Sequence, residues 1–166
     1  MLSDRTQITR NFRAGEFKCY CDGEFCAGYP SDMNKVLVVA QHTQILRDLA
    51  SAALGEEVWF DIGRGNSCLE YNNSIPGAKK NTSHHIYEIW PVGHGGEDVT
   101  PYIKARATSK YWLKNALAVM ARVAYASGWR GIKTYPGHNH LDRRDVPWLE
   151  NFDPVYRIPI KRSESV

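Results

Sequence analysis

Several features that would assign a protein to a class at once are missing from this sequence. No apolar run approaches the roughly 20 residues that a membrane-spanning helix requires, so we expect no membrane span. The first residues, MLSDRTQITRNF, have no apolar segment behind their charges, so we expect no secretion signal. Internal repeats and low-complexity segments are also missing, which argues against a repeat protein or a disordered chain. The formal net charge of +3 is too small to indicate nucleic acid as a partner.

The composition is that of a folded domain. The chain has 166 residues, of which 43% are apolar and 23% are charged, so it can bury the core of one domain. Because no export signal is expected, we expect that if the protein leaves a cell, it does so by lysis or as part of a particle.

A long helix is predicted over residues 31–54, where apolar residues recur at helical spacing. The residues expected to face the core along this helix are Val38, Ile45, Leu46, Leu49 and Ala53. His42 lies on the same stripe, and we expect a core histidine there, with a ligand role as the alternative.

The remaining elements follow from periodicity and turn residues. They are a helix at 109–127 and strands at 57–64, 85–92, 129–135 and 139–144, with a loop at 93–101. This order predicts an α+β fold in which helices pack on one side of a small antiparallel sheet.

The C-terminal residues are predicted to form an arm. We place a domain at 1–148 and an extended arm at 149–166, in which Pro159 excludes a helix. Such an arm could add a strand to a neighbouring chain or fold back on its own domain. Protein partners or self-assembly through the arm are therefore expected.

Four of the six histidines lie in two clusters. On an extended strand His138, His140 and Asp142 would share one face, and His85 opens a neighbouring predicted strand. Three nitrogen ligands and an open position are typical of catalytic zinc, for which Asp142 could be a general base or an orienting group. The alternative is that these are exposed polar residues at strand ends.

Seven short motifs between residues 11 and 148 occur in an order that resembles a known family. They are Asn11-Phe12, Glu16-Phe17-Lys18-Cys19, Leu46-Arg47, Gly65-Asn66-Ser67-Cys68 with Glu70-Tyr71-Asn72, Gly77-Ala78 with Ser83-His84-His85, Gly131-Ile132 with Tyr135-Pro136, and His140-Leu141-Asp142 with Arg144 and Trp148. In this order they resemble the zinc D-alanyl-D-alanine carboxypeptidase and L-alanyl-D-glutamate endopeptidase family, whose members trim bacterial peptidoglycan and serve as phage endolysins.

The resemblance carries expectations about fold, cofactor and site. It implies a fold similar to that of the D-alanyl-D-alanine carboxypeptidase and hedgehog-type peptidases, zinc as the cofactor, and His85 and His140 as ligands. It also implies peptidoglycan as a substrate and a phage setting. The residues expected to face the substrate are Arg64, Ser67 and Tyr135.

Three positions depart from the family pattern. The position expected to supply a metal-binding aspartate is Val92, which has no donor atom. The arginine expected to hold the substrate carboxylate is Ser67, which offers one neutral donor, and Arg64 lies three residues upstream. Trp90 stands where the family has a small residue and is expected to crowd the metal.

These departures predict a module that has lost its chemistry. Two histidines are fewer ligands than a protein zinc site normally has, although His138 or Glu88 could complete the set. We therefore expect a non-catalytic structural or binding module, such as a capsid-decoration, tail or baseplate component of a virion. The alternative is an active zinc-dependent peptidoglycan peptidase in which Asp142 is the base or orienting group.

The cysteines form a separate group, consisting of Cys19, Cys21, Cys26 and Cys68. We expect free thiols, or a disulfide between Cys68 and an N-terminal cysteine if the environment is oxidising. A structural zinc is the alternative, although C-x-C-x4-C is not a familiar zinc-finger spacing.

Overall fold

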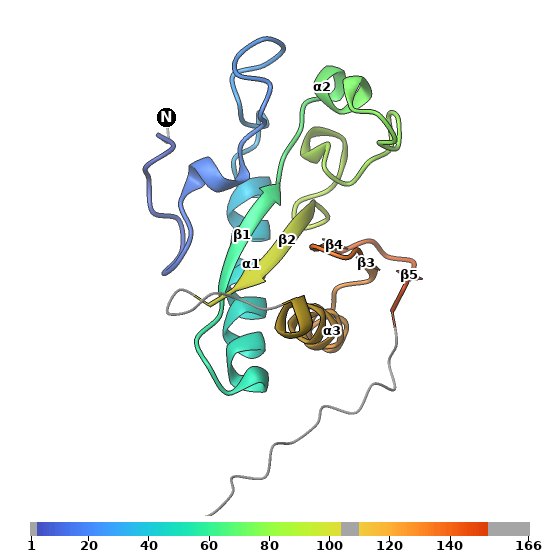
Figure 1. Ribbon diagram of the computed structural model, residues 1–166. Coiled ribbons are helices and arrows are strands. Elements are labelled where there is room, and N and C mark those ends of the chain that lie inside the picture. Colours follow the sequence, from blue (N-terminus) through green and yellow to red (C-terminus); the bar gives the residue numbers. More distant parts are fainter. Residues whose placement is uncertain (1–2, 104–109, 153–166) are drawn as a thin grey trace, which may run out of the picture.

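The computed structural model describes residues 3–103 and 110–152, which form an α+β structure (Figure 1). The helices are α1 (Asn34–Leu54), α2 (Leu69–Ser74) and α3 (Lys110–Ala126), and the short 3-10 helices are η1 (Ala14–Phe17) and η2 (Tyr87–Ile89). The strands are β1 (Trp59–Arg64), β2 (Gly96–Tyr102), β3 (Gly131–Thr134), β4 (Asn139–Asp142) and β5 (Trp148–Glu150). No helix in the described part of the chain is long and apolar enough to cross a membrane.

The five strands form one sheet in the order β1-β2-β4-β3-β5. Neighbouring strands are antiparallel except β3 and β5, which run parallel. The sheet is therefore mixed, and the expectation of a purely antiparallel sheet is wrong. The parallel pair arises because the chain passes from β4 to the far side of β3 before it extends again as β5.

The chain beyond Trp148 is still part of the domain. Leu149 pairs with Ile132 of β3, so the boundary predicted between 148 and 149 falls inside β5. Phe152 packs against the core and lies beside the ring of Tyr125, with centroids 5.5 Å apart. The rest of the predicted arm, residues 153–166, lies outside the described residues.

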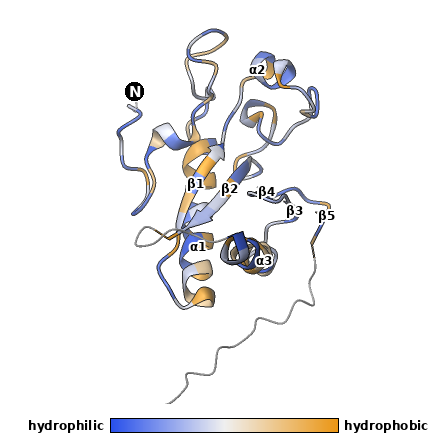
Figure 2. Cartoon of the chain, viewed as in Figure 1, coloured by the Kyte–Doolittle hydropathy of each residue, from blue (hydrophilic) through white to orange (hydrophobic). Residues whose placement is uncertain are grey.

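Helices α1 and α3 pack together and cover one face of the sheet (Figure 1). Apolar residues are concentrated on α1 and β1 (Figure 2). The helices contribute to the core Val36, Val39, Ala40, Leu46, Ala50, Leu117, Met120, Ala121 and Ala124. The strands contribute Phe60, Ile62, Val99, Ile132 and Leu141. Because this core occupies one face of the sheet, the opposite face is available for a site.

The face that helix α1 turns to the core matches the predicted stripe only in part, since Leu46 is fully buried but two other members are exposed. Ile45 and Leu49 remain 51% and 43% exposed, whereas the polar residue Thr43 is fully buried. The Thr43 hydroxyl donates a hydrogen bond to the Glu97 carboxyl group of β2 at 2.7 Å. Burial raises the pKa of Glu97 to about 8, so this side chain is mostly neutral at pH 7. A buried polar pair therefore sets which side of α1 faces the sheet.

One predicted strand is in the wrong place. Residues 85–92 form a turn and η2, whereas β2 occupies Gly96–Tyr102, where a loop was expected. Glycines and Pro101 argued against a strand there, but β1 and β4 pair with β2 on either side, and this pairing overrides local propensity. The predictions at 31–54, 57–64, 109–127, 129–135 and 139–144 are confirmed as α1, β1, α3, β3 and β4.

Candidate metal centre

The sheet face opposite the helices carries a row of polar side chains. Asp98 on β2 pairs across the sheet with His140 on β4, and His140 pairs with Lys133 on β3. Successive residues of a strand point to opposite faces, and the neighbours Val99 and Leu141 are buried in the core. Sheet register alone therefore places a carboxylate beside an imidazole.

His85 joins this row from the turn before η2. Its carbonyl accepts a hydrogen bond from the Ser67 amide at 2.7 Å, which fixes the turn against the chain after β1. Its Nε2 lies 3.1 Å from His140 Nδ1 and 3.4 Å from Asp98 Oδ1, and the latter two atoms are 2.9 Å apart. Ligand atoms about 2.0–2.1 Å from a tetrahedral zinc ion are about 3.3 Å from one another. The three residues therefore form a group that could hold one metal ion.

Both imidazoles are oriented for metal binding by a hydrogen bond at the other ring nitrogen. His85 Nδ1 is 3.0 Å from the Gly65 carbonyl, which can only accept, so Nδ1 carries the proton and Nε2 has a free lone pair. His140 Nε2 is 3.1 Å from an Asp142 carboxylate oxygen, which leaves His140 Nδ1 toward Asp98 and His85. Such second partners are the usual companions of metal-binding histidines.

Asp142 has an orienting position and not that of a base. Its side chain is fully buried, and Arg144 donates to it from Nε at 2.7 Å and also from Nη2. Gly131 on β3 faces this carboxylate, and a Cβ at position 131 would lie 2.2 Å from Asp142 Oδ1. Of the two roles expected for Asp142, the contacts favour the orienting one, because its oxygens are occupied by His140 and Arg144.

The electrostatics of the group favour a bound cation. Burial lowers the pKa of His85, which keeps this imidazole neutral. Burial opposes the charged form of His140 too, but hydrogen bonds with Asp142 and Asp98 raise its pKa to about 9. Burial likewise opposes the charged form of Asp98, yet its hydrogen bonds with His140 and His85 hold its pKa well below the usual range. A metal ion can replace the proton that the site otherwise retains.

The group opens into a cleft of about 510 Å³. The wall of the cleft contains Arg64, the loop from Ile75 to Lys79, the turn from Thr82 to His85, Asp98, Lys133, Tyr135, His138, His140, Arg144 and Trp148. Four of these side chains are basic. Lys133 is paired with Glu150 at 2.7 Å and Arg144 with Asp142, whereas the structure gives Arg64 and Lys79 no carboxylate partner among the described residues. The cleft is therefore suited to a ligand that carries negative charge.

The Arg64 guanidinium lies beside Ser67, the position at which the family pattern has an arginine. Its Nε donates to Ser67 Oγ at 3.1 Å and its Nη2 donates to Asn72 Oδ1 at 2.6 Å. Burial lowers the pKa of Arg64, but a guanidinium stays charged at neutral pH. Ser67 is itself buried and positions this guanidinium in the cleft wall.

The structure brings to His85 and His140 a carboxylate that the sequence motifs did not indicate. Val92 lies 44% exposed in the loop after η2, away from the group. Asp98, six positions further along the chain, is the carboxylate beside His85 and His140. The signal that could have located it is the alternation at Glu97, Asp98 and Val99.

The other residues considered as replacements or obstacles lie elsewhere. Glu88 accepts hydrogen bonds from the Ser31 amide and hydroxyl before α1. The Trp90 ring stacks on His84 with centroids 4.1 Å apart, and Trp90 is not part of the cleft wall. His138 is in the cleft wall, where its ring stacks on Tyr135 at 4.5 Å, but it is outside the metal-binding group.

A second group of side chains that could hold a metal ion consists of the four cysteines. They are not among the residues that line the cleft.

Neither a family model, nor a curated protein, nor a solved structure matches this chain.

Proposed function

We propose that the chain is a zinc-dependent peptidase that cleaves peptides bearing a free carboxylate. The observation that supports it is the convergence of His85, Asp98 and His140 at the wall of a basic cleft. The resemblance of the sequence motifs to peptidoglycan carboxypeptidases and endopeptidases makes bacterial cell-wall peptides the substrate class, and a phage endolysin the setting.

The donor set suits zinc. Two imidazoles and one carboxylate are a ligand set typical of catalytic zinc sites, which keep a fourth position for water or substrate. When bound, zinc acidifies a coordinated water and polarises the scissile carbonyl. His85 and Asp98 would hold it together with His140, whose orientation Asp142 maintains.

Residues of the cleft wall supply binding and proton transfer. Arg64 and Lys79 would hold the substrate carboxylate, since a guanidinium fork and an ammonium both suit that group. His138 would transfer protons at an imidazole nitrogen. It lines the cleft, and it is not one of the three residues of the metal-binding group. Tyr135 supports the His138 ring by stacking.

This proposal replaces the inactive module as the preferred function. The prediction of an inactive module depended on Val92 as an absent ligand, Ser67 as an absent arginine, Trp90 as an obstacle and the C-terminal arm. Trp90 stacks on His84 and is not in the cleft wall, and most of the arm lies outside the described residues. Asp98 fills the first role in the group, and Arg64 brings a guanidinium to Ser67.

The test is digestion of purified muropeptides by the full chain, followed by mass spectrometry of the products. We expect loss of a terminal residue or an internal cut, abolished by a chelator and restored by added zinc. A chain that binds no metal at this site and leaves every muropeptide intact would contradict the proposal and support the non-catalytic module.

A further inference from the structure

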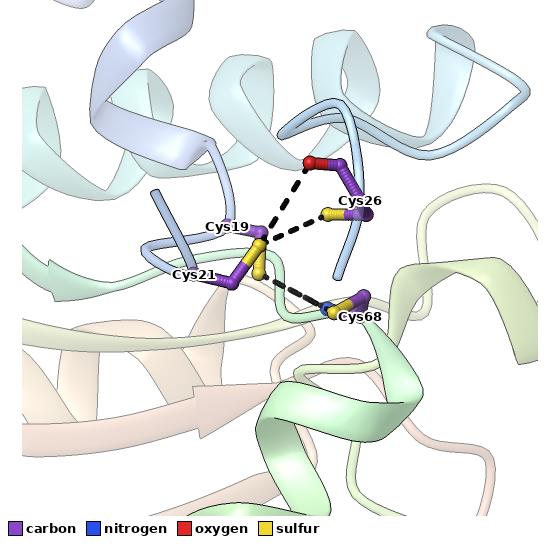
Figure 3. A group of neighbouring side chains, drawn as sticks. All are labelled: Cys19, Cys21, Cys26 and Cys68. Carbon is purple, nitrogen blue, oxygen red and sulfur yellow. Dashed lines mark hydrogen bonds between the residues drawn. The ribbon is translucent and has the colours of Figure 1, made fainter. Parts of the chain in front are cut away.

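The four cysteine sulfurs lie together at the junction of the N-terminal loop with α2 (Figure 3). Cys19, Cys21 and Cys26 come from the loop after η1, and Cys68 is the residue before α2. Cys19 and Cys21 are buried, at 3% and 4% exposure, and the other two are half-buried. All four sulfurs lie within 4.8 Å of one another.

Their spacing fits four thiolates around one ion. The Cys19 and Cys68 sulfurs are 3.8 Å apart, and those of Cys21 and Cys26 are 3.5 Å apart. In a tetrahedral zinc site with Zn–S bonds of about 2.3 Å, the sulfurs are about 3.8 Å from one another. A disulfide instead requires about 2.05 Å between two sulfurs, so neither pair has the separation of a bonded pair.

Several backbone contacts hold the sulfurs in this arrangement. The Cys68 amide donates to Cys19 Sγ and the Gly28 amide to Cys26 Sγ, both at 3.3 Å, and such donors stabilise negative charge on sulfur. The loop itself is closed by the Cys19 amide, which donates to the Gly28 carbonyl at 2.6 Å. Gly28 has a φ of 96°, which favours glycine.

The two segments are also fastened beside the cysteines. The Asn66 amide donates to the Phe17 carbonyl at 3.0 Å. A Cβ at Gly65 would lie 2.8 Å from Phe17 Cα, so this close approach needs glycine. Cys68 is therefore brought to Cys19 by packing that does not itself require a bond between sulfurs.

We propose that Cys19, Cys21, Cys26 and Cys68 bind one zinc ion as a closed structural site. Each thiol loses its proton to solvent as its sulfur bonds to the metal, and no oxidant or reductant is needed. Four protein ligands leave no position for water, so this ion has a structural role. The site fastens the N-terminal loop to the segment that also carries Arg64 of the cleft wall and Ser67, which contacts Arg64. It is independent of the proposed peptidase activity.

The test begins with Asp98→Ala, which removes a ligand from the cleft group and leaves every cysteine in place. We expect two zinc ions per chain in the wild-type protein and one in this variant. After exchange into cobalt, the variant should show thiolate-to-cobalt charge-transfer bands in the near ultraviolet. No zinc in the wild-type protein, or cobalt binding to the variant without these bands, would overturn the proposal. One zinc in both the wild-type chain and the variant, with the bands present, would support the cysteine site and contradict only the metal centre of the cleft.

A thiol count decides between zinc and disulfides without any cysteine substitution. The wild-type chain, purified without reductant and then denatured with a chelator, should present four reactive thiols. Two disulfides, seen as a mass four hydrogens lower and as no reactive thiol, would contradict the zinc site. The variant Cys21→Ser should lose both the second zinc and the charge-transfer bands. If that variant does not fold, the spectrum of Asp98→Ala and the thiol count still decide.

Discussion

The two metal-binding groups of this molecule differ in their ligands and in what surrounds them. His85, Asp98 and His140 offer two nitrogens and one oxygen, and they border a cleft. The cysteine group offers four sulfurs and is not part of the cleft wall. Three ligands beside a cleft leave a position for water and substrate, whereas four thiolates enclose an ion completely. The difference separates a group arranged for chemistry from one arranged for stability.

A short stretch of chain connects the two groups. Arg64 lines the cleft, the Gly65 carbonyl orients His85, and Ser67 contacts both Arg64 and the backbone of His85. The next residue, Cys68, belongs to the cysteine group. Fixing Cys68 therefore restrains residues that shape the cleft. A change in the cysteine group should therefore also affect the group of His85, Asp98 and His140, but less than a change made in that group directly.

The largest expected effect is that of Asp98→Ala on peptide hydrolysis. Changes in groups that only orient a ligand cost roughly 10–100-fold, and loss of a ligand should cost more. We expect cleavage to fall below detection in the muropeptide assay. The matched control is Val92→Ala, at the exposed position where the family pattern places the carboxylate, and it should cleave as the wild-type chain does. Equal losses in both variants would remove Asp98 from the site.

The second prediction is that thermal stability depends more on the cysteine group than on the group at the cleft. In Cys21→Ser we expect the unfolding temperature to fall further than in Asp98→Ala, although more hydrolysis survives. A loss of about 3 kcal/mol would lower it by roughly 6–12 °C in a domain of this size. Calorimetry and the muropeptide assay on the same preparations give both readouts. If Asp98→Ala is the less stable variant, the division of roles between the two groups fails.

The third prediction concerns the guanidinium between the two groups. Arg64→Gln removes a charged donor to the substrate carboxylate, and we expect kcat/KM to fall about 10–100-fold, the range of a lost charge-assisted hydrogen bond. A substrate amidated at its terminal carboxylate is the control, because it should distinguish the variant from the wild-type chain little or not at all. The same loss on both substrates would mean that Arg64 shapes the cleft without binding the carboxylate.

The sequence predicts the ligands that lie in regular elements better than those displaced by a loop. His140 and Asp142 were placed on one strand face by the period of two, and β4 confirms this. Asp98 was missed because a loop was expected at residues 93–101, and only the pairing of β2 with β4 brings Asp98 to His140. Sheet register is a long-range property, so local periodicity cannot supply it.

The cysteine group shows the same limit from another direction. C-x-C-x4-C fits no common zinc-finger spacing. The three loop cysteines come together because the loop bends at Asp22 and Gly23, both with positive φ. The fourth cysteine, Cys68, follows α1 and β1 in the sequence. It comes close to the loop because Gly65 packs on Phe17. The sequence indicates which four residues could bind a metal ion. That their sulfurs lie close together depends on tertiary contacts, which the sequence pattern does not predict.

The smallest expected effect comes from a half-buried histidine outside both groups. His42 of α1 lies beside Trp129, with ring centroids 6.4 Å apart, and its Nδ1 is buried with no hydrogen-bond partner among the described residues. The ring is partly exposed and lies outside the core cluster, and it lacks the second partner that orients His85 and His140. Burial, and then the charge of Arg143, lower the pKa of His42 to about 4.

Because the pKa of His42 is lowered by folding, the unfolded chain binds a proton there more tightly. The stability from the neutral ring is therefore complete above about pH 6.5 and is lost as the pH falls toward 4. Between pH 7.5 and 5, urea unfolding of the wild-type chain should lose about 1–2 kcal/mol more than that of His42→Leu, after allowance for the partial exposure of the ring. Groups at the two metal sites titrate equally in both chains and cancel in this difference. Identical pH dependence in the two chains would show that folding does not lower the pKa of His42, and would contradict the prediction.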